Sequence, residues 1–199
     1  MAININFFDH SIRTTVTCDP DTVTSWINSI EIIHHRRLRN LVVGLDIEWL
    51  PNFYNRHPSR NPISVLQLCV GHHCLVFQLQ HACYIPQSLH NFLSDDDYTF
   101  VGVGIDDDVQ KLYYDYDLEV SNTVDLRTLA SIRYDQPTLG NTGLVKLAEM
   151  VLGLQYNKPR DITISNWTNR YLSETQKEYA AIDAFLSFEI GKCLDAAHF

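Results

Sequence analysis

One segment in the N-terminal half constrains the fold of this chain more than any other. Residues 41–49 read LVVGLDIEW, a nearly continuous apolar run that is typical of a strand buried on both faces of a sheet. Two carboxylates, Asp46 and Glu48, interrupt the run, and residues two apart on a strand project from the same face. Burying either carboxylate without a partner costs several kcal/mol. The segment therefore predicts a central strand that carries two acids on one face.

Two interpretations of this D-x-E pair are open at this point. A divalent cation accounts for it, because Mg²⁺ binds carboxylate oxygens and keeps some of its water. A solvent-exposed strand end accounts for it as well, because many strands end in exposed acidic residues. The choice between them depends on whether other parts of the chain place further candidate metal ligands beside Asp46 and Glu48.

The rest of the chain alternates between strand and helix patterns. We expect one or two strands in residues 3–18, and further strands at 63–70, 74–77, 98–103 and 123–126. The short turn at 71–73 predicts an antiparallel hairpin. Helices are expected from about residue 20 to 37 and at 86–93, 106–114, 126–132, 143–152 and 173–194. This order predicts a single α/β domain over residues 1–199, with a mixed central sheet flanked by helices and an N-terminal strand extension at 1–19.

Composition excludes several classes of protein. The chain has 199 residues, of which 45% are hydrophobic and 20% charged, and this mixture excludes a disordered, collagen-like or coiled-coil chain. The formal net charge of −9 argues against binding nucleic acid through bulk positive charge. If nucleic acid is the partner, the non-specific affinity of the protein for it should be modest and salt-sensitive. Assembly into a homo-oligomer, or a second protein, would then strengthen binding.

Targeting signals and cysteines bear on where the protein works. No apolar run is long enough to span a bilayer, and the N-terminus lacks the basic start and apolar stretch of a signal peptide. We therefore expect no membrane partner and an intracellular protein, in the nucleus or cytoplasm and not secreted. The five cysteines form no C-x-x-C pair, so neither a disulfide framework nor a zinc ribbon is predicted, and reduced thiols are expected.

Two further acidic segments lie on predicted helices. Residues 102–108 read GVGIDDD, where a strand gives way to a helix. Aspartates at a helix N-terminus are favoured by capping and by the helix dipole, but three in a row cannot all cap one helix. In the last helix Tyr179 and Asp183 are four residues apart and share one face. Each segment alone is compatible with a purely structural role.

Together these segments resemble the DEDDy 3′–5′ exonucleases of the RNase H-like (DnaQ-like) superfamily. Five ordered motifs carry the resemblance: GLDIEW at 44–49, SVLQLC at 64–69, VGVGIDDD at 101–108, SNW at 165–167 and YAAIDA at 179–184. The resemblance covers about residues 24–195 and is closest to the exonuclease domain of the Werner syndrome protein and its plant relatives. It implies an RNase H-like fold and an enzyme that hydrolyses terminal phosphodiester bonds from 3′ ends.

The resemblance also implies roles for the acidic residues. Asp46, Glu48, Asp108 and Asp183 would hold two divalent ions, Mg²⁺ or Mn²⁺, in a two-metal-ion mechanism, and Tyr179 would orient the attacking water. Asp108 is chosen over its two neighbours because it stands in the family's Gly-x-Gly-x-x-x-Asp position. A phenol with an unperturbed pKa of about 10 is a poor base at pH 7, so the metal ions, and not Tyr179, would lower the pKa of the attacking water.

The substrate and the residues that bind it are less narrowly defined. The expected substrate is a nucleic acid with a 3′ end, with DNA somewhat preferred over RNA. The alternatives are an RNase D-like enzyme that trims RNA, and a catalytically weak scaffold that binds nucleic acid or protein. By strict alternation Trp49 faces the core, with contact to the terminal nucleotide as its alternative role. Arg56, His57 and Arg60 follow in a loop and are candidates for phosphate contacts.

Overall fold

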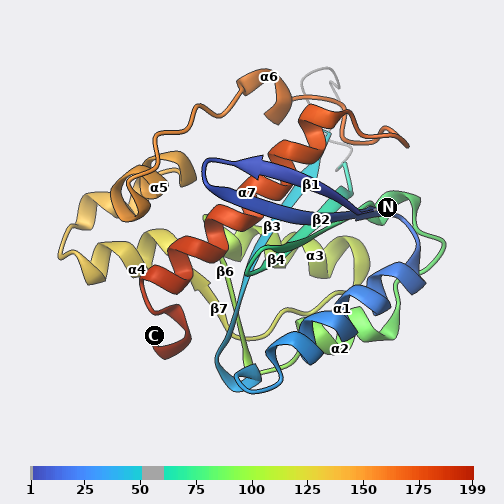
Figure 1. Ribbon diagram of the computed structural model, residues 1–199, viewed down its shortest axis with the longest axis horizontal. Helices are drawn as coiled ribbons and strands as arrows, with labels where there is room; N and C mark the ends of the chain where they lie inside the picture. The colour runs from blue at the N-terminus through green and yellow to red at the C-terminus, as the bar shows by residue number, and fades with distance from the viewer. Residues whose placement is uncertain (1, 51–60) are drawn as a thin grey trace.

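A mixed sheet forms the centre of the protein (Figure 1). The structure is a computed structural model, and it describes residues 2–50 and 61–199. Its seven strands within these residues are β1 (Ala2–Phe7), β2 (His10–Thr17), β3 (Leu41–Trp49), β4 (Ile63–Val70), β5 (His73–Phe77), β6 (Tyr98–Gly102) and β7 (Thr123–Asp125).

The strand order is β1-β2-β5-β4-β3-β6-β7. Strands β1/β2, β5/β4 and β4/β3 pair antiparallel, whereas β2/β5, β3/β6 and β6/β7 pair parallel. The expected hairpin is therefore β4–β5, and the N-terminal strands join the sheet beside β5. This arrangement confirms the predicted α/β class with a mixed central sheet, and it places β3, with its two acids, inside the sheet.

The helices also follow the sequence pattern closely. The final helix begins with the predicted capping box, in which Ser173 and Gln176 each bond the other's backbone N–H. The short helix α6 was not predicted. None of the helices in the described parts of the chain is long and apolar enough to cross a bilayer. The helices are α1 (Pro20–His34), α2 (Gln87–Leu93), α3 (Ile105–Tyr116), α4 (Leu126–Arg133), α5 (Leu144–Leu152), α6 (Arg160–Thr163) and α7 (Glu174–Cys193).

Helices α1 and α7 cover opposite faces of the sheet. The Sγ atom of Cys74 on β5 lies 3.6 Å from the carbonyl oxygen of Ala181 on α7. The preceding residue, His73, lines a cavity together with Trp26 of α1. Because successive strand residues point to opposite faces, the two helices lie on different sides. Helix α7 crosses the sheet diagonally, so its side chains meet several strands (Figure 1).

Gly44 sets how closely α7 approaches β3. A Cβ atom built on Gly44 would lie 2.0 Å from the carbonyl oxygen of Ala184 and 2.7 Å from the backbone nitrogen of Phe188. Only a residue without a side chain fits there. Gly44, Asp46 and Glu48 share one face of β3, so the close contact at Gly44 also brings α7 over the two acids.

Substituting Gly44 with alanine should therefore destabilise the protein strongly. The new methyl group meets backbone atoms of α7 that cannot move aside individually, so we expect a loss of about 3 kcal/mol or more in the free energy of unfolding. Chemical denaturation measures it. Gly140→Ala is the matched control, because nothing lies within 4 Å of its added Cβ. A Gly44→Ala protein as stable as this control would contradict the packing described above.

The cysteines require a correction. Reduced thiols were expected throughout, but the structure joins Cys69 and Cys74 in a disulfide. These residues are direct partners across the β4–β5 hairpin, with Cα atoms 4.1 Å apart. Cross-strand neighbours are close enough to bridge without any C-x-x-C spacing. Cys18, Cys83 and Cys193 are free.

Candidate active site

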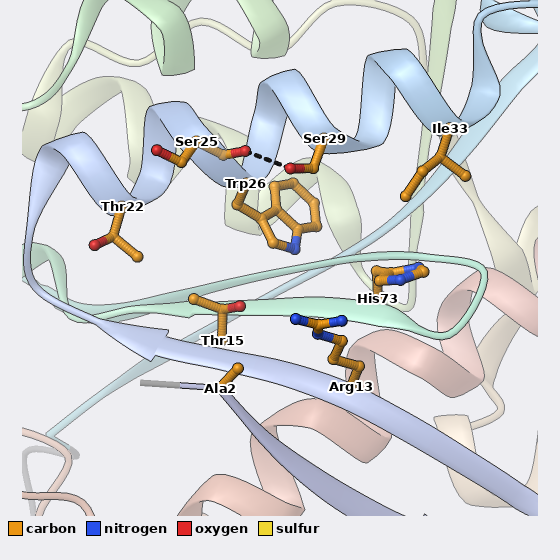
Figure 2. A pocket seen from close by; sticks show the side chains of 9 residues that line it. All are labelled: Ala2, Arg13, Thr15, Thr22, Ser25, Trp26, Ser29, Ile33 and His73. Carbon is orange, nitrogen blue, oxygen red and sulfur yellow. Dashed lines mark hydrogen bonds between the residues drawn. The ribbon is translucent and has the colours of Figure 1, made fainter.

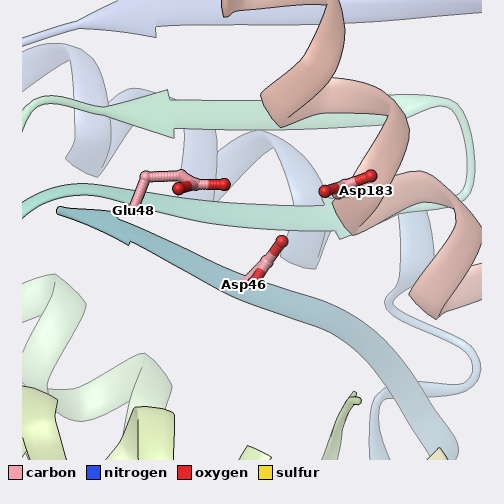
Figure 3. A group of neighbouring side chains, drawn as sticks. All are labelled: Asp46, Glu48 and Asp183. Carbon is pink, nitrogen blue, oxygen red and sulfur yellow. The ribbon is translucent and has the colours of Figure 1, made fainter. Parts of the chain in front are cut away.

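Three of the predicted acids converge at one point of the fold. Asp46 and Glu48 project from β3, and Asp183 projects from α7 towards them (Figure 3). Each offers a carboxylate oxygen, and these oxygens all lie within 4.8 Å of one another. Asp183 and Glu48 are buried, whereas Asp46 is half-buried. The fold thus gathers acids from distant parts of the chain into one cluster.

Burial makes this cluster electrostatically unfavourable in its charged form. Burial, followed by the charges of Asp46 and Asp183, raises the pKa of Glu48 to about 10. Burial also raises the pKa of Asp183 to about 7, although the ammonium of Lys158 opposes the shift. Burial raises the pKa of Asp46 as well, although the charge of Lys158 and a hydrogen bond from the backbone N–H of Ile47 act to lower it. Such groups hold protons until a cation replaces them.

Asp108 lies beside this cluster, at the start of α3. It is half-buried, whereas Asp106 and Asp107 are exposed, which agrees with the choice of Asp108 from the motif position. Burial, and next the charge of Asp46, raises the pKa of Asp108 to about 9. The chain enters α3 through Gly104, whose φ of +78° suits a residue without a side chain.

Tyr179 is held firmly against the cluster. Its side chain is buried, and its hydroxyl shares a 2.9 Å hydrogen bond with the hydroxyl of Thr163. A small apolar group that includes Val65 and Trp167 packs around its ring. Burial and the charge of Asp183 raise the pKa of Tyr179, so the phenol keeps its proton at neutral pH. It can therefore donate or accept a hydrogen bond but cannot act as a general base.

Lys158 is a site residue that the sequence did not reveal. It comes from the irregular segment between α5 and α6, and its Nζ lies 2.5 Å from Oδ2 of Asp183. The same ammonium lies 4.6 Å from the ring centroid of Tyr179. No helical or strand periodicity marks its position, so nothing in the sequence placed it beside the acids.

A cavity of about 290 Å³ opens onto these residues. Its polar lining residues are Asp46, Glu48, Asp108, Lys158, Thr163 and Tyr179. Its apolar lining residues are Ile47, Trp49, Val103 and Ile164. An acidic floor beneath an apolar wall suits a ligand that carries both a phosphate-bound cation and a flat base.

The position of Trp49 corrects the expectation that it packs in the core. Its side chain is 38% exposed and lines the cavity, and the Lys111 ammonium lies 5.5 Å from its ring centroid. Trp49 is the last residue of β3 and lies where the β3–β4 register shifts, at the end of the strand rather than in its buried middle. Trp49 is thus available to a ligand. The other loop candidates, Arg56, His57 and Arg60, lie outside the described residues.

A second cavity, of about 400 Å³, lies away from this chemistry. Arg13, Trp26 and His73 are among its lining residues, beneath α1 on the face of the sheet opposite α7 (Figure 2). None of the clustered acids lines it. The carboxylate cavity is therefore the candidate active site.

The residues of this site fit a hard divalent cation. All the candidate ligands are carboxylate oxygens, which Mg²⁺ and Mn²⁺ prefer. Both oxygens of Asp183 are buried; Oδ2 contacts the Lys158 ammonium, and Oδ1 has no hydrogen-bond partner within the described structure. A buried carboxylate of this kind requires a cation, and Lys158 supplies only a single charge to three clustered acids.

A sequence profile of the 3′–5′ exonuclease family matches residues 15–196. The chain belongs to this family. A 3′–5′ exonuclease of Arabidopsis thaliana is 36% identical over 153 residues, which cover 76% of this chain and 52% of that protein. The mouse bifunctional 3′–5′ exonuclease/ATP-dependent helicase WRN is 38% identical over 146 residues, or 72% of this chain and 10% of that one. The chain thus spans about half or less of these relatives.

Solved structures of exonucleases share the fold. The EXD2 exonuclease domain is 29% identical, has a TM-score of 0.51, and the match covers 91% of this chain and 88% of that one. Escherichia coli RNase D has a TM-score of 0.73 at 18% identity over 93% of this chain and 45% of that one, a likeness in fold alone. Crystal structures of the EXD2 exonuclease domain were also solved soaked in Mn and Mg, and in Mn and dGMP.

Proposed function

We propose that this member of the 3′–5′ exonuclease family hydrolyses the terminal phosphodiester bond at the 3′ end of a nucleic acid, with DNA preferred over RNA. The observation that carries the proposal is the convergence of carboxylate oxygens of Asp46, Glu48 and Asp183 within 4.8 Å of one another, where Asp46 and Glu48 also line a small cavity. A scaffold protein has no physical reason to gather unfavourable acids in one place.

The proposed chemistry divides between the metal ions and the protein. Two bound Mg²⁺ or Mn²⁺ ions would activate water and stabilise the developing negative charge. Asp46, Glu48 and Asp183 would hold them, together with Asp108 from the start of α3. Tyr179, fixed by Thr163, would keep the attacking water in line through its protonated hydroxyl.

The shape of the cavity supports attack at a chain end. Its volume of about 290 Å³ is just below the usual range for small-molecule sites, roughly 300–1,000 Å³. Trp49 and Ile164 offer apolar surface to a terminal base, while the acids lie where its phosphate would be cleaved. A site of this size admits the last nucleotide of a strand, which favours removal of single nucleotides.

The test is direct. Single-stranded, duplex and recessed DNA, and matching RNA, carry a 5′ label and are incubated with Mg²⁺ or Mn²⁺. We expect a ladder that shortens from the 3′ end, faster for DNA than for RNA, and complete loss of products in excess EDTA because the acids alone cannot activate water.

Two controls sharpen this result. A circular single strand has no end and should stay intact, which separates exonuclease from endonuclease cleavage. An Asp183→Asn protein purified in parallel should yield no ladder, which excludes a contaminating nuclease. Cleavage that persists in EDTA contradicts the metal-dependent mechanism, and no cleavage of any substrate would favour the scaffold.

A further inference from the structure

Lys158 lies inside the carboxylate cluster as its positive counter-charge. Its Nζ is 2.5 Å from Oδ2 of Asp183, and its side chain is only 28% exposed. The same ammonium lies 4.6 Å from the centroid of the Tyr179 ring. A lysine side chain is positively charged at neutral pH, so Lys158 places a cation beside a buried carboxylate.

A divalent ion needs the same oxygens that Lys158 contacts. Mg²⁺ binds carboxylate oxygens at about 2.1 Å, and an ammonium in contact with the same carboxylate would then lie within a few ångströms of it. Two cations that close repel strongly in a buried site. Lys158 and a metal ion on Asp183 cannot both keep their best positions.

The backbone around Lys158 allows the side chain to withdraw. Residues 153–159 belong to neither a helix nor a strand, and Gly153, Gln155, Asn157 and Pro159 are exposed. Leu154 and Tyr156 anchor the segment by packing partly against the core. The ammonium can leave Asp183 through rotation of its long side chain, without disturbing β3 or α7.

We propose that Lys158 is a displaceable counter-ion that occupies the carboxylate cluster until a divalent metal replaces it. The proposal rests on the metal site of the proposed function and adds a competitor built into the chain. In the metal-free protein Lys158 offsets repulsion among the acids. It thereby raises the metal concentration needed to load the site.

Metal binding without nucleic acid tests the competition. Mn²⁺ is titrated into the protein, and free Mn²⁺ is followed by electron paramagnetic resonance, for wild type, Lys158→Met and Lys158→Arg. Methionine keeps an unbranched stem of similar length but removes the charge. We expect Lys158→Met to bind Mn²⁺ at least about tenfold more tightly, Lys158→Arg to stay close to wild type, and Lys158→Met to melt at a lower temperature in EDTA.

Lys146→Met is the matched control. Lys146 also forms an ion pair, with Glu149 on α5, but its side chain is 61% exposed and it does not line the cavity. Its substitution should change neither Mn²⁺ affinity nor the melting temperature in EDTA. A shift as large as that of Lys158→Met would show a general charge effect and would overturn the proposal.

A measurement on the wild-type protein covers the case in which Lys158→Met fails to fold. Lysines are acetylated with and without Mn²⁺, and the rate at Lys158 is read by mass spectrometry against that of Lys146. We expect Mn²⁺ to increase acetylation of Lys158 about tenfold and to leave Lys146 unchanged. Continued protection of Lys158 in saturating Mn²⁺ overturns the proposal.

The outcomes separate the two proposals. If wild type binds Mn²⁺ and Lys158→Met binds it no more tightly, the counter-ion role is wrong while the metal site stands. If neither protein binds Mn²⁺, both the metal site and the counter-ion role are wrong.

Discussion

Replacing Glu48 with glutamine is expected to abolish hydrolysis without destabilising the metal-free protein. The pKa of Glu48 is raised to about 10, so in the absence of metal this side chain is already neutral at pH 7. Glutamine has nearly the same shape and charge as the protonated acid. The melting temperature in EDTA should therefore change by no more than about 2 °C.

The metal-bound state responds quite differently. A neutral amide cannot replace a carboxylate that neutralises a divalent ion, and losing several kcal/mol of stabilisation reduces the rate at least about 10³-fold. Added Mg²⁺ should raise the melting temperature of wild type and should raise that of Glu48→Gln much less. The assays are single-turnover cleavage and thermal melting with and without Mg²⁺.

Asp106→Asn provides the comparison for this variant. Asp106 is an exposed acid at the start of α3, so Asp106→Asn makes the same carboxylate-to-amide change without touching the cavity. It should cleave and melt like wild type. A Glu48→Gln protein that keeps a tenth or more of the wild-type rate would show that Glu48 is not a metal ligand.

Local patterns made most of the fold predictable from the sequence. The apolar run of β3 identified a buried strand, and the capping box at Ser173 identified the start of α7. The two acids of β3 stood out because charge is rare on such a strand. The family resemblance implied their convergence with Asp183. The close approach at Gly44, on which this convergence depends, is a tertiary contact that was not predicted.

The errors have identifiable physical causes. Alternation predicts that Trp49 faces the core, but Trp49 is the last residue of β3, where the sheet no longer covers its side chain, and it lines the cavity. Lys158 lies on an irregular segment, where no periodicity indicates which way a side chain points. The Cys69–Cys74 disulfide, in contrast, could have been predicted from the sequence, because the predicted turn at 71–73 already places these residues opposite each other in a hairpin.

The affinity for metal is expected to rise steeply with pH. The pKa values of Glu48 and Asp108, about 10 and about 9, mean that both hold protons in the metal-free protein between pH 6 and about 8. A divalent ion that binds both carboxylates must release two protons. Each released proton strengthens apparent binding by about tenfold per pH unit, so the two together give up to about 100-fold.

The same shifts give the metal-free protein the opposite trend. The unfolded pKa values are 4.5 for Glu48 and 3.8 for Asp108, so the folded state binds extra protons from about pH 4 up to about 9 or 10. Because both folded values are raised, the free energy of unfolding in EDTA should fall as pH rises through this window, by up to about 1.4 kcal/mol per pH unit for each retained proton. Melting in EDTA at several pH values measures this fall.

Calorimetry of Mn²⁺ binding in buffers with different ionisation enthalpies counts the released protons. Wild type should release two or more near pH 7, because Asp183, with its pKa raised to about 7, also holds part of a proton there. Asp108→Asn should release one fewer, and Asp107→Asn the same number as wild type, because Asp107 is exposed and does not line the cavity. If Asp108→Asn released as many protons as wild type, Asp108 would not be a metal ligand. If wild type released no protons, the acids would already be ionised in the metal-free protein. The positive charge of Lys158 would then be sufficient to keep them ionised despite their burial.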